Sequence, residues 1–218
     1  MTLLHFESIP IKELHEPLVD LSIYDFVLEP VYFKQGLSRD ARMFLRKSVA
    51  DKLIKIQNNL EGYKFKIWDG FRSREVQNAI YQKFWNEFKK DHPEWDEDRL
   101  KKEVGMFVTV ANDLNRIPPH ATGGAVDLTL VDPNGKALEM GTSFDYFGPE
   151  AMSFYFEGNG DNGQAKVNQK ILREAMSAED FSIDKEEWWH FDYGNQKWAI
   201  QLNKPEAFFG EAQTPNAK

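Results

Sequence analysis

Cysteine is absent from the 218 residues of the chain, so disulfides and thiolate metal ligands are both excluded. Any metal site must therefore be built from histidine, aspartate or glutamate side chains. Histidine is itself scarce, with five residues in the sequence, which leaves few candidate ligands to consider. The lack of thiols is compatible with a reducing compartment, where disulfides are rare.

Long apolar runs are missing as well, and none approaches the roughly 18 residues of a membrane span. The first residues lack the basic and apolar regions of a secretory signal, so we expect a cytoplasmic location. The net charge of −8 disfavours binding to nucleic acid. We therefore expect no nucleic acid and no membrane as partner; the sequence does not define the oligomeric state.

The apolar content is sufficient for a substantial core, with 41% hydrophobic and 14% aromatic residues. The length predicts a single domain over residues 1–218, with a loose tail from about residue 204. Prolines interrupt residues 1–37, which we interpret as an irregular or short-stranded wrap. Periodicity predicts helices near 39–58 after a capping Ser38, 73–92, 95–104 and 164–177. Strands are expected near 63–67, 125–131, 187–193 and 198–202.

Helices and strands segregate along the chain rather than alternating regularly. This arrangement is typical of an α+β fold, here with a small antiparallel sheet flanked by helices. A turn signal at residues 132–135 suggests that residues 137–140 return antiparallel to the strand before them.

Residues 119–130 read PHATGGAVDLTL and place His120 and Asp127 seven positions apart. The two glycines between them permit the chain to fold back sharply. A lone histidine in such a stretch is more often a hydrogen-bonded core residue. An aspartate inside an apolar run, however, is costly unless it is paired or bound to a metal. The residues thus indicate a metal site.

A second block, EWWH at residues 187–190, adds Glu187 and His190. Together the two blocks supply two imidazoles, one ligating carboxylate and one spare carboxylate. A catalytic zinc uses about three protein ligands and keeps one open position. Residues three apart face opposite sides of a regular strand, so we expect Glu187 to precede the strand or a bulge to intervene.

These blocks, with WDGFR at 68–72 and GTSFD at 141–145 in the same order, resemble the zinc D-alanyl-D-alanine dipeptidases of the zinc DD-peptidase family. The spaced blocks cover about residues 60–195. The resemblance implies the zinc DD-peptidase fold and a small D-dipeptide as substrate. It also implies one Zn²⁺ per chain, with His120, Asp127 and His190 as its ligands.

The resemblance further implies catalytic roles for Glu187 and Arg72. Zinc lowers the pKa of a bound water towards about 7. Glu187 would take the proton and deliver it to the departing amine, and Arg72 would stabilise the oxyanion. Asp184 and Glu186 are rival acids nearby. A surface salt bridge is the competing role for Arg72, although a cation is poorly placed at a helix start. Asp69 can orient Arg72 or cap the turn that follows.

One position departs from the family. Its dipeptidases carry a serine two residues before the first zinc histidine, whereas Pro118 here has neither a hydroxyl nor a backbone donor. The preference for a free dipeptide therefore stays open. A DD-carboxypeptidase or a peptidoglycan endopeptidase of the same superfamily is an alternative. A non-catalytic zinc-binding module is another, but it needs neither Glu187 nor Arg72.

Overall fold

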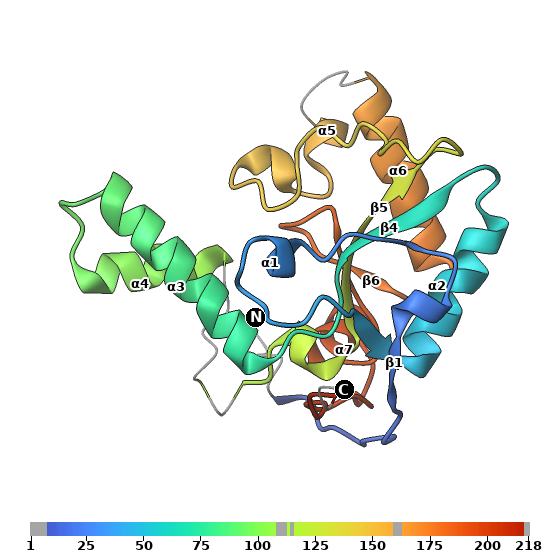
Figure 1. Cartoon of the computed structure of the whole chain (residues 1–218), viewed down its shortest axis with the longest axis horizontal. Coiled ribbons are helices and arrows are strands. Elements are labelled where there is room, and N and C mark those ends of the chain that lie inside the picture. Colours follow the sequence, from blue (N-terminus) through green and yellow to red (C-terminus); the bar gives the residue numbers. More distant parts are fainter. Residues whose placement is uncertain (1–7, 108–112, 114–115, 159–162, 216–218) are drawn as a thin grey trace.

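The computed structural model describes residues 8–107, 113, 116–158 and 163–215 (Figure 1). Residues 1–7, in which we expect no secretory signal, lie outside the described residues. Among the described residues, no helix combines the length and apolarity needed to cross a membrane.

A five-stranded sheet forms the centre, in the order β2-β4-β5-β7-β6. Its strands are β2 (Val27–Leu28), β4 (Lys64–Asp69), β5 (Ala125–Val131), β7 (His190–Asp192) and β6 (Ser182–Ile183). Neighbouring strands run antiparallel except β2, which lies parallel to β4. The α+β class is confirmed, but the sheet is mixed rather than purely antiparallel. The predicted return after β5 is reduced to one bridge between Val131 and Ala137.

The central strand β5 is buried at every residue, which explains its nearly continuous apolar sequence. Helices α2 (Lys47–Asn59) and α6 (Gly163–Ser177) contribute Leu53 and Leu172 to the core that contains Leu128 of β5. Figure 1 shows both helices on the same side of the sheet. The predictions for β4, β5 and α6 are confirmed.

The predicted start of α2 is wrong. Residues Phe44–Arg46 form β3, which pairs with β1 (Leu18–Asp20), and the helix begins at Lys47. Ser38 caps no helix; its hydroxyl accepts a hydrogen bond from the backbone N–H of Asp40. Pairing with β1 overrides the helical spacing of Met43 and Phe44, because both side chains are buried in the extended conformation. The N-terminal region also contains η2 (Leu21–Ile23) and α1 (Val31–Lys34), as expected for a wrap of short elements.

Helices α3 (Arg74–Asp91) and α4 (Glu97–Phe107) form an arm that projects from the sheet (Figure 1). Both were predicted, and Ser73 caps α3 by accepting a hydrogen bond from the N–H of Val76 at 3.3 Å. A separate apolar cluster holds the arm: Tyr32, Ile80, Tyr81, Phe84 and Val104. The arm therefore lies beside α1, close to the mouth of the site described below.

The C-terminal region differs from the prediction. Residues expected to form a strand form helix α7 (Gln196–Gln201), because the Asn195 side chain caps its start at the N–H of Trp198. The segment after residue 204, expected to be loose, buries Ala207 and Phe209 completely. Farther along, the N–H of Ala212 donates to the carbonyl of Ala121. The remaining short elements are η3 (Pro119–Thr122), η4 (Pro149–Ala151) and α5 (Tyr155–Gly158).

Candidate active site

Adjacent strands bring the predicted metal ligands together. Asp127 of β5 and His190 of β7 are paired residues in the antiparallel ladder, while His120 lies on η3 just before β5. Gly123 ends η3 with a left-handed φ of 69°. A Cβ on Gly124 would lie 2.4 Å from the carbonyl oxygen of Tyr193, so this close approach requires glycine. The fold-back expected from the glycine pair is present.

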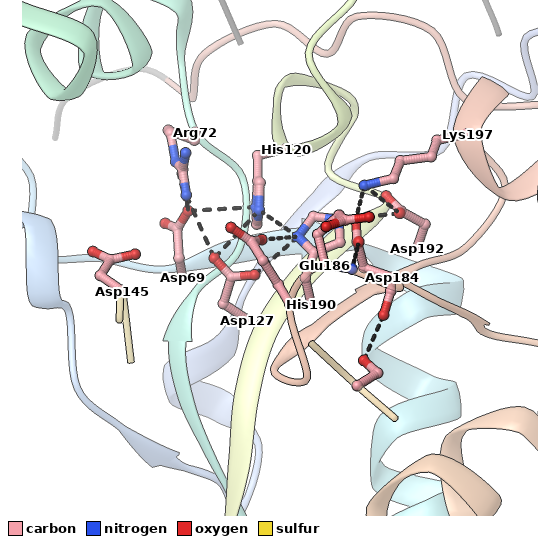
Figure 2. Close-up of polar contacts among 12 residues, drawn as sticks. Asp69, Arg72, His120, Asp127, Asp145, Asp184, Glu186, His190, Asp192 and Lys197 are labelled. Carbon is pink, nitrogen blue, oxygen red and sulfur yellow. Dashed lines mark hydrogen bonds and ion pairs between the residues drawn. The ribbon is translucent and has the colours of Figure 1, made fainter. Parts of the chain in front are cut away.

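The three side chains converge on one point (Figure 2). His120 Nε2 lies 3.2 Å from His190 Nδ1 and 3.3 Å from Asp127 Oδ2, and His190 Nδ1 lies 3.0 Å from Asp127 Oδ1. All three residues are at most 6% exposed. Two imidazole nitrogens and a carboxylate at this spacing form a donor set suited to a divalent ion.

The outer nitrogen of each imidazole has its own partner. His120 Nδ1 lies 2.8 Å from the carbonyl oxygen of Gly70, which can only accept, so the Nδ1 carries the proton. His190 Nε2 lies 3.0 Å from Asp192 Oδ2. These bonds leave His120 Nε2 and His190 Nδ1 directed inward. Such outer partners set the tautomer and orientation of metal-binding histidines.

A second acidic group lies on the far side of His190 and includes Asp184 and Asp192. Lys197 of α7 makes an ion pair with Asp184 and lies 3.8 Å from Asp192 Oδ2. Burial raises the pKa of Asp192, but His190 and Lys197 outweigh burial and hold its pKa below the usual range. The Lys197 ammonium thus already supplies a positive charge beside Asp184 and Asp192. The group formed by His120, Asp127 and His190 is therefore the metal-site candidate.

Glu187 precedes β7 rather than lying within it. This placement satisfies the expectation from strand geometry, and the Glu187 Oε2 lies 4.0 Å from His190 Nδ1. Burial raises the pKa of Glu187 to about 8, opposed by His190 and reinforced by Asp127. Of the rival acids, Asp184 is paired with Lys197, and Glu186 is exposed. Glu187 is thus placed to accept a proton beside the three converging side chains.

Arg72 is buried beside Asp69 and Asp127 (Figure 2). Its Nε donates to Asp69 at 2.7 Å, its Nη1 donates to Gln77 at 2.9 Å, and its Nη2 lies 3.4 Å from Asp127 Oδ2. Of the two roles expected for Asp69, orienting Arg72 or capping the following turn, the structure shows the first. A buried position beside Asp127 excludes a surface salt bridge as its role. Arg74, two residues farther along the chain, is half-buried and donates to Glu211.

Asp145 and Tyr32 lie beside Arg72, and the sequence pattern assigned a role to neither. The Tyr32 hydroxyl lies 3.3 Å from both carboxylate oxygens of Asp145 and 3.3 Å from Arg72 Nη2. Burial raises the pKa of Asp145 to about 7. The block at residues 141–145 contributed to the family resemblance without an assigned role. Asp192, Lys197 and Gln77 were also missed, and no local motif marks them.

A cavity of about 220 Å³ opens onto these groups. Its lining combines charged residues with apolar side chains. Its lining includes Arg72, His120, Asp127, Asp145, Glu187 and His190, with Ile80, Phe84, Phe147, Pro118, Pro119 and Trp189. Trp189 lines this cavity, whereas Trp188 packs in the core and donates to Thr142. The polar groups therefore converge inside a partly apolar enclosure.

The amino-acid sequence and the fold were compared with those of known proteins, and both have similar relatives. A D-alanyl-D-alanine dipeptidase of Synechocystis sp. is 27% identical over 221 residues, covering 90% of each chain. A D-alanyl-D-alanine dipeptidase of Escherichia coli (strain K12) is 26% identical over 160 residues, covering 72% of this chain and 70% of its own. The solved structure of VanYB in complex with D-Alanine-D-Alanine aligns with a TM-score of 0.48 at 17% identity, covering 82% of this chain and 83% of that chain.

The family model of the peptidase M15 group, described as D-ala-D-ala dipeptidase, matches residues 25–209. This match spans the sheet, the converging side chains and α7. The chain is a hydrolase and belongs to the M15 family of D-ala-D-ala dipeptidases.

Proposed function

We propose that this protein is a zinc-dependent dipeptidase that hydrolyses D-alanyl-D-alanine. The observation that carries the proposal is the convergence of two imidazole nitrogens and one carboxylate within 3.3 Å of one another, with Glu187 beside them. The substrate follows from the family model and from the names of the relatives from Synechocystis sp. and Escherichia coli.

The residues present fit a zinc ion. His120, Asp127 and His190 would hold it, and the hydrogen bonds of Gly70 and Asp192 direct the correct imidazole nitrogens inward. When bound, zinc supplies a Lewis acid that polarises the scissile carbonyl and acidifies water. The absence of cysteine removes the thiolate ligands common in structural zinc sites.

Glu187 acts as the general base. It accepts a proton from the attacking water and returns it to the amine that leaves when the peptide C–N bond breaks. The raised pKa of about 8 describes the carboxyl beside His190 and Lys197 but without a divalent ion. A nearby positive charge lowers a carboxyl pKa, so the loaded site favours the carboxylate form that a base requires.

Arg72 stabilises the negative charge that develops on the carbonyl oxygen during attack. Its guanidinium is held in place by Asp69 and Gln77 before substrate arrives, which removes the cost of reorganising it. Glu187 and Arg72 both line the cavity of the metal-site candidate. A purely structural zinc module would need neither group, so the arrangement favours catalysis.

The test is hydrolysis of D-alanyl-D-alanine by protein depleted of metal with a chelator and then supplied with one equivalent of Zn²⁺. We expect activity to disappear on depletion and return on addition. His120→Ala should abolish both zinc binding and turnover, whereas His92→Ala, outside the cavity lining, should change neither. Hydrolysis of a pentapeptide ending in D-Ala-D-Ala, without hydrolysis of the free dipeptide, would contradict the proposal and indicate a carboxypeptidase.

A further inference from the structure

The proposed general base, Glu187, lies on the loop of a β-hairpin. Strands β6 and β7 pair antiparallel, and residues 184–189 form the loop between them. The conformation of this loop decides where the Glu187 carboxyl lies relative to His190, whose Nδ1 is 4.0 Å from Glu187 Oε2. A loop lacks the regular hydrogen-bond ladder of a sheet, so other contacts must fix its shape. The contacts that hold this loop therefore bear directly on the proton transfer.

The side chain of Asp184 closes a turn immediately before Glu187. Its Oδ1 accepts a hydrogen bond from the N–H of Glu186 at 2.8 Å. An aspartate that bonds the N–H two residues farther on forms an Asx turn, which fixes the backbone locally. On the other side of Glu187, the N–H of Trp188 donates to the carbonyl oxygen of Ala151 at 2.9 Å. Glu187 is thus held between a backbone contact and the turn that Asp184 closes.

The second oxygen of the Asp184 carboxylate is paired with Lys197 of α7 (Figure 2). The same ammonium lies 3.8 Å from Asp192 Oδ2, and that oxygen lies 3.0 Å from Nε2 of His190. The Asp184 side chain is 8% exposed, so its charge needs a partner of opposite sign. Because Oδ2 faces Lys197, Oδ1 faces the loop. Lys197 therefore fixes the rotation of the carboxylate that closes the turn.

The hairpin itself is anchored without the Asp184 side chain. The Ser153 hydroxyl donates to the carbonyl oxygen of Asp184, and the N–H of Ser153 donates to that of Lys185 at 3.1 Å. The N–H of Asp184 extends the ladder between β6 and β7 by donating to the carbonyl oxygen of His190 at 3.3 Å. Loss of the Asp184 carboxylate should therefore change the turn before Glu187 and leave the hairpin folded.

We infer that Asp184, held by Lys197, is a positioning residue that places the Glu187 carboxyl for proton transfer. This inference rests on the proposed function and adds the groups that hold the general base. Both oxygens of the Asp184 carboxylate are engaged, one by Lys197 and the other by the N–H of Glu186. Asp184 therefore acts through Glu187 rather than on the peptide. The two acids that the sequence left as rivals have different functions, one as base and one as its support.

The test measures hydrolysis of D-alanyl-D-alanine by zinc-loaded variants at position 184. Asp184→Ala removes the turn contact and should lower kcat by about 10- to 100-fold, the cost of misplacing a catalytic group, with KM and zinc content nearly unchanged. Asp184→Asn keeps an oxygen that can accept the N–H of Glu186 and should recover part of the loss. Lys197 keeps Asp192 as an ion-pair partner in both variants. Asp132→Ala is the matched control, because Asp132 closes the same kind of turn onto Asn134 at 2.9 Å outside the cavity lining; its kcat should be unchanged.

A double-mutant cycle separates positioning from a general structural role. If Asp184 acts through the base, Asp184→Ala should lower kcat no further in a Glu187→Gln background. Losses that add in the double variant, or an unchanged kcat in Asp184→Ala alone, would overturn the inference while leaving the proposed function intact. Absence of hydrolysis by the unaltered, zinc-loaded chain would instead overturn the proposed function. Zinc content and thermal unfolding, measured for each variant, ensure that the rates compared are those of folded, loaded proteins.

Discussion

Asp127 and His190 are paired across neighbouring antiparallel strands, and their side chains meet with 3.0 Å between Oδ1 and Nδ1. Both strands lie inside the sheet, so two of the three metal-ligand candidates sit on buried, rigid backbone. Glu187 comes from the turn just before β7. The side chains proposed to hold an ion therefore lie on different backbone from the side chain proposed to transfer the proton, and each role can be tested separately.

Replacing the proposed general base, Glu187, should remove catalysis and leave metal binding. Glu187→Gln keeps the size of the side chain but cannot accept the proton, so we expect turnover to fall by about 10²- to 10⁴-fold. Zinc content, measured by elemental analysis, should stay near one per chain. Glu97→Gln is the matched control, because this carboxylate is exposed on α4 and lies outside the cavity lining. Unchanged turnover in Glu187→Gln would show that another group takes the proton.

Replacing Arg72 should lower turnover more than it lowers zinc affinity. Removing one donor to a developing oxyanion costs about 10²- to 10³-fold in kcat. Because Arg72 also contacts the buried Asp69, Arg72→Lys should be measured beside Arg72→Ala, since it preserves a positive charge. Steady-state kinetics with parallel zinc titration provides the measurement. Loss of zinc with little change in kcat of the loaded enzyme would assign Arg72 a structural role.

Asp192 should control zinc affinity through His190. The Asp192 carboxylate lies 3.0 Å from His190 Nε2 and is completely buried. Removal of such a partner typically lowers metal affinity or activity by about 10- to 100-fold, so we expect that loss of affinity in Asp192→Asn. Competition with a chromophoric chelator measures it. Asp98→Asn on exposed α4 should have no effect, and equal affinities for all three proteins would refute the role.

Asp145 should make stability depend on pH in the metal-free protein. Burial raises its pKa from 3.8 to about 7, so the folded chain holds a proton that the unfolded chain releases between those values. Its contribution to stability is complete below about pH 4 and is lost as the pH rises through 7. Asparagine stays neutral and tolerates the left-handed backbone at φ 58°. In thermal unfolding, the Tm of Asp145→Asn minus that of the original chain should increase by a few degrees as the pH rises from 4 to 8. A difference that does not vary with pH would contradict this.

Two glycine substitutions should have opposite effects on stability. Gly124→Ala forces a Cβ to 2.4 Å from a backbone oxygen, which we expect to cost about 1–3 kcal/mol in the free energy of unfolding. Gly105→Ala in α4 meets nothing within 4 Å and should stabilise the helix by up to about 1 kcal/mol. Chemical denaturation measures both. Equal stability of the two variants would show that the fold-back before β5 relaxes freely.

The local patterns of the sequence determined the main elements. Alternation in residues 63–67 predicts β4, the apolar run with its single aspartate predicts β5, and Ser73 marks the start of α3. Residue chemistry and the family resemblance nominated His120, Asp127 and His190, which the fold brings together. These inferences succeed because periodicity, capping and the cost of burying a charge act over a few residues.

Only the tertiary structure decided the features that depend on contacts between residues far apart in the sequence. Pairing with β1 converts residues 44–46 from a predicted helix into strand β3, and the Asn195 cap makes residues 196–201 helical. Asp192, Lys197 and Tyr32 join the site through contacts that only the folded chain creates, and the segment near Phe209 is packed for the same reason. Burial and partner choice depend on residues distant in sequence. The sequence therefore determined which candidate reactive groups are present, whereas the fold decided which neighbours orient them and shift their pKa values.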